Sequence, residues 1–195
     1  RTTASDQHAA RKLLKGVKVV DTDAHITEWP DLWTSRAPAA FKDRMPQRKT
    51  VDGRTAWVIG DYELGKNYGF SAIMKDGTKL PGLEFFDHPL EDVTLGAYDL
   101  AARLAYLDEN GLAAQIAYTN LLGFGGGKSM KVDADLREMA IRIQNEAMAE
   151  MQAESGNRIY PMAMLPWWDV NKAVAEGERC ADMGLRGINI HANPQ

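Results

Sequence analysis

From about residue 95 onward, strand-like and helix-like segments alternate along this chain of 195 residues. Apolar segments at 113–118, 159–165 and 187–191 have the length of buried strands, and stretches with helical apolar spacing lie between them. Strands that alternate with helices form parallel βαβ units. The sequence therefore predicts an α/β fold, and it places the functional residues at the carboxyl ends of the strands.

The helical segments carry their own start and stop signals. Leu100, Leu104 and Leu107 predict one apolar helix face, and Gly111 ends that helix. A second, longer stripe comprises Leu136, Met139, Ala140, Ile143, Ala147 and Met151. A third helix is predicted after Asp169, whose side chain can cap the first turn.

Ahead of these units, an apolar run at 17–20 predicts a buried strand that leads into an Asp-x-Asp-x-His motif at 21–25. Because side chains alternate along a strand, we expect Asp21, Asp23 and His25 on one face. Carboxylate oxygen and imidazole nitrogen both suit zinc, manganese or iron. The two carboxylates and the imidazole of the motif therefore predict a pocket for a divalent metal ion.

Residues 29–95 separate this first strand from the alternating units and show no helical period. Segments 55–59 and 61–64 flank Gly60 and predict a β-hairpin. Long connections inside compact domains are typically functional. We therefore expect an insertion that covers the carboxyl ends of the strands as a pocket wall.

Composition excludes several functional classes. The net charge of −4 argues against a broad nucleic-acid surface, and no apolar run is long enough to span a bilayer. The single cysteine, Cys180, allows no internal disulfide and favours a cytoplasmic location, and we expect it to be a packing residue. The expected partner is a small-molecule substrate, and a homodimer stays open.

Five stretches, in order, resemble the amidohydrolase-related family, which includes aminocarboxymuconate-semialdehyde decarboxylase. They are the Val-Asp-x-Asp-x-His motif at 20–25 and the segments 103–111, 145–147, 157–163 and 183–188. The resemblance implies a (β/α)8 TIM barrel with one divalent metal ion, of which this chain would hold about the first four β/α units. We accordingly expect an amino-terminal arm at 1–16 and a barrel domain at 17–195 that contains the insertion.

Members of this family usually carry His-x-His on the first strand, and here Asp23 and His25 occupy those two positions. Some members have an acidic residue at the first position, so the resemblance implies that both residues ligate the metal, with zinc preferred over manganese or iron. Asp21 is then expected to support these two ligands and not to bind the metal itself. The other family ligands, a fifth-strand histidine and an eighth-strand aspartate that also serves as the base, would lie beyond Gln195. The chain begins with Arg1 and stops after a strand, so we expect an amino-terminal half that is inactive alone.

Three further residues at predicted strand ends are candidates for substrate contact: Asn120, Trp167 and His191. The glycine-rich segment 123–127 is expected to be an active-site loop. It does not fit a Walker phosphate loop, because Leu122 stands where that pattern requires its first glycine.

The expected function is metal-dependent hydrolysis of a small carboxylated or cyclic organic substrate by a metal-activated water. The resemblance equally includes metal-dependent non-oxidative decarboxylases of aromatic or muconate-like acids, which form the alternative. The Asp-x-Asp pair also resembles haloacid-dehalogenase-type phosphatases, with Asp21 as nucleophile, but that family usually has Thr or Val where His25 stands. A non-catalytic binding fragment is the remaining reading.

Overall fold

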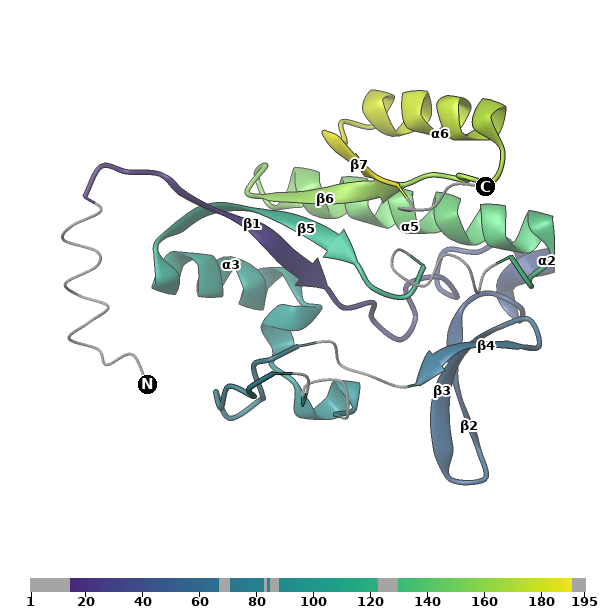
Figure 1. Ribbon diagram of the computed structural model, residues 1–195, viewed down its shortest axis with the longest axis horizontal. Helices are drawn as coiled ribbons and strands as arrows, with labels where there is room; N and C mark the ends of the chain where they lie inside the picture. Colours follow the sequence, from purple (N-terminus) through teal and green to yellow (C-terminus); the bar gives the residue numbers. More distant parts are fainter. Residues whose placement is uncertain (1–14, 67–70, 83, 85–87, 123–129, 191–195) are drawn as a thin grey trace.

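The computed structural model describes residues 15–66, 71–82, 84, 88–122 and 130–190. Its main element is a parallel sheet with the strand order β1-β5-β6-β7 (Figure 1). The strands are β1 (Val19–Ile26), β5 (Leu112–Thr119), β6 (Ile159–Met164) and β7 (Gly187–Asn189). Each strand pairs with the next strand of this sheet along the chain, as successive βαβ units require. The predicted α/β class and parallel sheet are confirmed.

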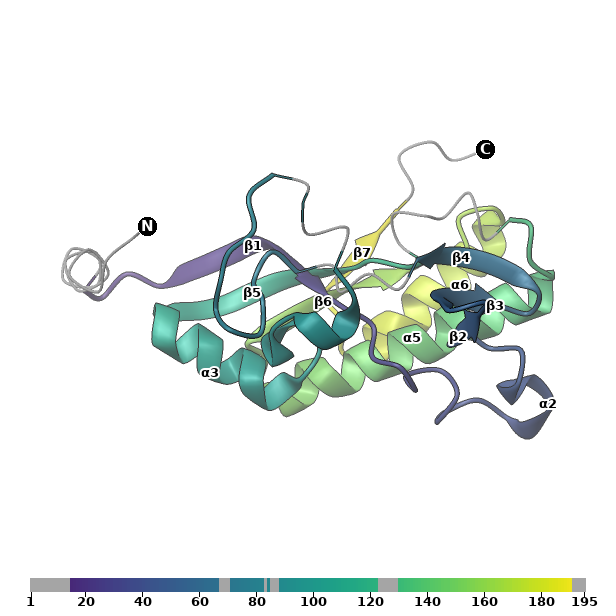
Figure 2. The same cartoon turned by 90° about the horizontal axis from the view of Figure 1, so that it is seen from below.

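Three helices connect these strands and lie on the same side of the sheet (Figure 2). They are α3 (Leu100–Asn110), α5 (Ala134–Glu154) and α6 (Val170–Asp182). As predicted, Asp169 caps α6 by accepting from the backbone N–H of Lys172 at 3.1 Å, and Gly111 ends α3 in the left-handed region at φ 67°. Cover on one side is typical of a barrel segment, whereas a doubly wound sheet carries helices on both faces.

The insertion forms a second, antiparallel sheet. It contains α2 (Ala39–Lys42), β2 (Gln47–Val51), β3 (Arg54–Ile59), β4 (Tyr62–Lys66) and two 3-10 turns, η2 (Leu90–Asp92) and η3 (Leu95–Ala97). The predicted hairpin across Gly60 is confirmed, with Ile59 opposite Tyr62. The strand β2 was not predicted, because its sequence is largely polar and only its antiparallel pairing with β3 makes it a strand.

Two buried tryptophans anchor this second sheet to the long helix α5. The indole Nε1 of Trp33 donates to the carbonyl of Ala140 at 2.9 Å. Trp57 meets Trp33 edge to face, with ring centroids 5.7 Å apart. The second sheet therefore shares one continuous core with the parallel sheet, near the carboxyl ends of β1 and β5 (Figure 1). In the part of the chain described, no helix is long and apolar enough to cross a membrane.

Candidate functional site

The strand β1 begins at Val19 and contains the whole Asp-x-Asp-x-His motif. Between the pair Asp21–Gln115 and the pair Ala24–Ala117, β1 advances three residues while β5 advances two. The extra residue forms a β-bulge at 22–23. Side-chain alternation is therefore interrupted in the middle of the motif.

Asp21 stays bonded within the motif, because its Oδ1 accepts from the backbone N–H of Asp23 at 3.2 Å, and its other oxygen has a partner on β5. Gln115, which is buried, donates its amide Nε2 to Asp21 Oδ2 at 2.9 Å and accepts from Arg103 of α3 at 3.2 Å. Asp21 thus belongs to a polar chain that leads under the sheet to a helix. The bulge interrupts the regular alternation on which the prediction of one shared face rested, and all three side chains line the same cavity.

Arg103 ties three elements together beneath the site. Its Nε donates to the carbonyl of Gly96 at 2.8 Å, and its Nη2 donates to the carbonyl of His25. Burial lowers the pKa of Arg103 to about 10, against the opposing charge of Asp21, so the guanidinium stays protonated at neutral pH. The backbone of His25 is therefore held from the helix side.

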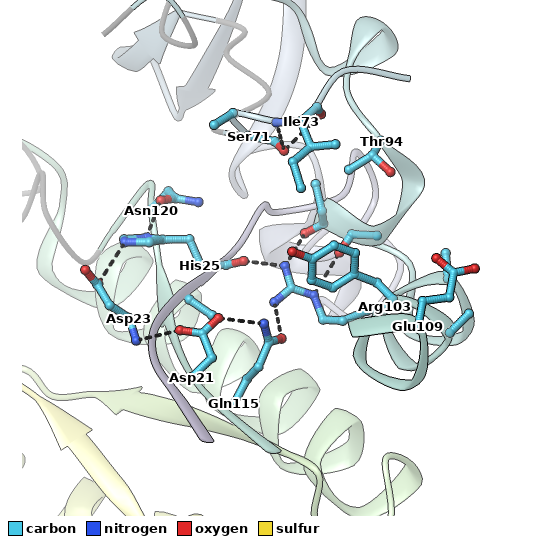
Figure 3. Close-up of a pocket in the computed structure, with 17 residues that line it drawn as sticks. Asp21, Asp23, His25, Ser71, Ile73, Thr94, Arg103, Glu109, Gln115 and Asn120 are labelled. Atoms are coloured by element: carbon cyan, nitrogen blue, oxygen red, sulfur yellow. Dashed lines mark hydrogen bonds and ion pairs between the residues drawn. The ribbon is translucent and has the colours of Figure 1, made fainter. Parts of the chain in front are cut away.

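Asp23 and His25 lie together at the carboxyl-terminal end of β1 (Figure 3). His25 Nε2 is 3.9 Å from Asp23 Oδ1, and the two side chains are 32% and 89% exposed. Two ligands of one zinc ion lie roughly 3 to 3.5 Å apart, given metal–ligand distances near 2.1 Å. The predicted proximity is confirmed, and a small rotation of the exposed Asp23 side chain would bring both donors to ligand spacing.

Asn120 fixes the orientation of the imidazole from the end of β5. Its Nδ2 donates to the carbonyl of Ile26 at 3.0 Å, and its Oδ1 lies 2.9 Å from His25 Nδ1. Because a carbonyl only accepts, the amide nitrogen must face Ile26, and the amide oxygen must accept from His25. The proton of a neutral His25 therefore sits on Nδ1, which leaves the lone pair on Nε2, facing Asp23.

Glu28 is a functional candidate that the sequence analysis missed. Its side chain is 1% exposed, and Oε1 accepts from the backbone N–H of Asn120 at 2.7 Å and of Leu121 at 3.0 Å. Oε2 has no hydrogen-bond partner among the described residues. Burial raises the pKa of Glu28 to about 7 in spite of these donors. In the sequence, the only sign of this role was that Glu28 is an acidic residue shortly after Ile26, the last residue of β1.

A cavity of about 870 Å³ lies beside β1 and is open to Asp23 and His25 (Figure 3). The insertion contributes Ser71, Ala72, Ile73, Thr94, Gly96 and Ala97 to its lining, and α3 contributes Ala102, Arg103, Ala105, Tyr106 and Glu109. The later part of the insertion therefore forms the predicted wall. The earlier part packs on α5 instead, where Trp33 is enclosed.

The other predicted site residues have different fates. His191 and the glycine-rich segment 123–127 lie outside the described residues. Trp167 packs edge to face on Trp168 at 5.8 Å and does not line the described cavity. Cys180 is buried in α6, as expected of a packing residue. Over the described ranges, no three His, Cys, Asp or Glu side chains gather closely enough to hold a metal ion.

Neither a known protein family model nor a curated protein matches this chain. Among solved structures, an amidohydrolase from Mycobacterium avium subsp. paratuberculosis K-10 is similar, with a TM-score of 0.63 and 20% identity over 87% of this chain and 48% of that one. The IDCase of Metarhizium anisopliae, in apo form, has a TM-score of 0.51 and 17% identity over 89% of this chain and 42% of that one. At these identities the likeness is one of fold, and this chain spans about half the length of each.

Proposed function

We propose that this chain belongs to a metal-dependent enzyme of the amidohydrolase superfamily and contributes the first-strand half of its metal site. The observation that carries the proposal is the pair of Asp23 and His25, 3.9 Å apart, with the imidazole lone pair directed by Asn120 toward the carboxylate. The fold likeness to a solved amidohydrolase supports it. Barrel closure beyond the four described parallel strands is part of the proposal.

The donor set fits a divalent ion of the zinc, manganese or iron class. Neutral imidazole nitrogen and carboxylate oxygen are accepted by all three, and zinc is the first choice. A catalytic zinc site needs about three protein ligands and an open position. Asp23 and His25 supply two, so the proposal requires at least one more ligand from residues outside the described ranges.

The proposed reaction is hydrolysis of a small carboxylated or cyclic organic substrate. When bound, a divalent ion supplies a water of lowered pKa and polarises a carbonyl group. The chain's own residues hold and orient: Asn120 keeps the His25 proton on Nδ1, and Arg103 fixes the backbone at His25. The cavity beside β1 offers about 870 Å³, enough for a small organic molecule.

Metal binding by the full-length protein tests the proposal. We expect Asp23→Ala and His25→Ala each to lower zinc affinity by more than about 100-fold, because loss of mere supporting partners typically costs about 10- to 100-fold. Calorimetry with zinc alone, together with metal content after purification, measures this directly. Hydrolysis should be lost in the same variants.

Matched replacements elsewhere serve as controls. His88→Ala and Asp182→Ala remove the same side-chain types at positions far from the motif in sequence, and both variants should bind zinc like the parent protein. Undiminished zinc affinity in His25→Ala would remove the metal site from the proposal. Full hydrolytic activity in a metal-free His25→Ala protein would remove the mechanism.

Non-oxidative decarboxylation remains the alternative reaction for the same site. A panel of carboxylated aromatics and lactones separates the two, since hydrolysis opens an ester or amide bond while decarboxylation releases carbon dioxide. Zinc-dependent carbon dioxide release without any hydrolysis would select the carboxy-lyase. Absence of both metal binding and turnover in the full-length protein would favour a non-catalytic binding role.

A further inference from the structure

Glu28 lies between two segments that meet at the candidate site. One is the end of β1, which carries Asp23 and His25, and the other is the turn that follows β5. Glu28 Oε1 accepts from the backbone N–H groups of Asn120 and Leu121, at 2.7 and 3.0 Å. One carboxyl oxygen from the first segment thus fixes two consecutive amides of the second.

The same two segments are joined in the reverse direction by the Asn120 side chain. Its amide nitrogen donates to the carbonyl of Ile26, and its amide oxygen accepts from His25 Nδ1. Glu28 therefore fixes the backbone of Asn120, and the Asn120 side chain in turn contacts His25. Four hydrogen bonds therefore join the two segments, and two of them run from Glu28 through Asn120 to the ring of His25.

We infer that Glu28 is a positioning residue for this site: it holds the turn after β5 so that Asn120 presents its amide oxygen to His25. The contact works through hydrogen-bond acceptance by Oε1, and not through negative charge, because Asn120 and Leu121 offer ordinary backbone donors. The consequence for metal binding rests on the proposed function. The consequence for the position of the imidazole proton does not.

Burial supports this reading over a simple surface turn. The Glu28 side chain is 1% exposed, and enclosing a carboxyl group is unfavourable unless its partners compensate. An apolar residue would fill the same space without that penalty. An apolar residue, however, could not accept hydrogen bonds from the backbone N–H groups of Asn120 and Leu121, as Oε1 does.

Three replacements separate acceptance, charge and volume. Glu28→Gln keeps an acceptor oxygen at the same reach and removes the charge. Glu28→Met keeps the volume and removes the acceptor. Glu28→Asp keeps the charge and withdraws the acceptor by one methylene group. Glu178→Met, at an exposed position of α6, is the matched control.

The principal readout is nitrogen NMR of histidine-labelled full-length protein without metal. The sequence has four histidines, so the His25 ring signals can be assigned by their loss in a His25→Gln variant. At about pH 8, where an ordinary histidine is neutral, the parent protein and Glu28→Gln should show the proton on Nδ1. Glu28→Met and Glu28→Asp should shift the nitrogen signals toward a mixture of the two tautomers.

Zinc affinity is the second readout, with an expected loss of about 10-fold in Glu28→Met and Glu28→Asp and no change in Glu28→Gln or Glu178→Met. An unchanged His25 tautomer in both Glu28→Met and Glu28→Asp would overturn the inference, whatever happens to zinc. Should Glu28→Met not fold, Glu28→Asp alone decides. A tautomer shift in a protein that never binds zinc would support the inference and refute the proposed function.

Discussion

At the scale of single residues, the enclosed carboxyl group of Glu28 makes stability depend on pH. Burial raises its pKa from 4.5 to about 7, so between these values the folded protein keeps a proton that the unfolded chain has lost. The free energy of unfolding should therefore decrease as the pH rises through this window, by on the order of 3 kcal/mol. In Glu28→Gln, which does not titrate, this decrease should be absent.

Urea unfolding of the parent protein and Glu28→Gln at about pH 5 and pH 8 measures this difference. Subtracting the two proteins cancels the titration of all other groups that the replacement leaves untouched. Equal changes of unfolding free energy in both proteins would mean that Glu28 titrates normally in the folded state.

At the scale of elements, Asn145 joins α5, β6 and α6. It is fully buried, its Oδ1 accepts from the backbone N–H of Met164, and its Nδ2 donates to the Met164 carbonyl and to Glu176 of α6. Replacement by leucine leaves these buried groups without their partner. We expect Asn145→Leu to destabilise the fold by about 2 to 4 kcal/mol.

Denaturant unfolding checks this value, and Glu154→Ala, at an exposed position near the end of α5, is the control and should change stability by less than about 0.5 kcal/mol. Asn145 packs the βαβ units together and does not touch the candidate site, so the zinc binding proposed for Asp23 and His25 should be unchanged in the Asn145→Leu protein that remains folded. A stability equal to that of the parent would show that the Met164 backbone finds other partners.

The alternation of strands and helices was predictable because each element shows its own apolar spacing and capping residues within its own segment of the sequence. The stripe from Leu136 to Met151 has helical spacing, and Asp169 caps the next helix with its own side chain. The strand β2 was not predictable, since its polar residues acquire their structure only by pairing with β3. Local pattern was sufficient wherever an element buries its own apolar face.

In the candidate site, too, the features set by local spacing were predictable and those set by residues remote in sequence were not. The proximity of Asp23 and His25 followed from their spacing on one strand. The direction of Asp21 did not, because it depends on how many residues β5 sets against β1. Glu28 and Arg103 act through partners that are remote in sequence, the turn at Asn120 and the carbonyl of His25, so no local pattern could reveal them.

At the scale of the whole molecule, the parallel sheet has β1 and β7 at its two edges. Apolar side chains near these edges and on α6 are exposed: Val20, Ile188, Val170 and Val174. Sheet edges with apolar neighbours are normally covered. The proposed closed barrel would cover them with further strands and helices.

Hydrogen exchange of the full-length protein tests this closure. We expect the outer backbone amides of β1 and β7 to exchange as slowly as those of β5, which is already paired on both sides. In the 195-residue chain alone, the same amides should exchange much faster than those of β5. Fast exchange at both edges of the full-length protein would contradict a closed barrel.

The bulge in β1 has one more consequence. Asp21 and Asp23 are the same chemical group two positions apart, and in a regular strand they would be equivalent neighbours. With the added residue their surroundings differ. The Asp21 carboxylate accepts a hydrogen bond from Gln115 of β5, while the Asp23 carboxylate faces solvent beside His25. Which aspartate lies beside His25 is thus set by the register between β1 and β5.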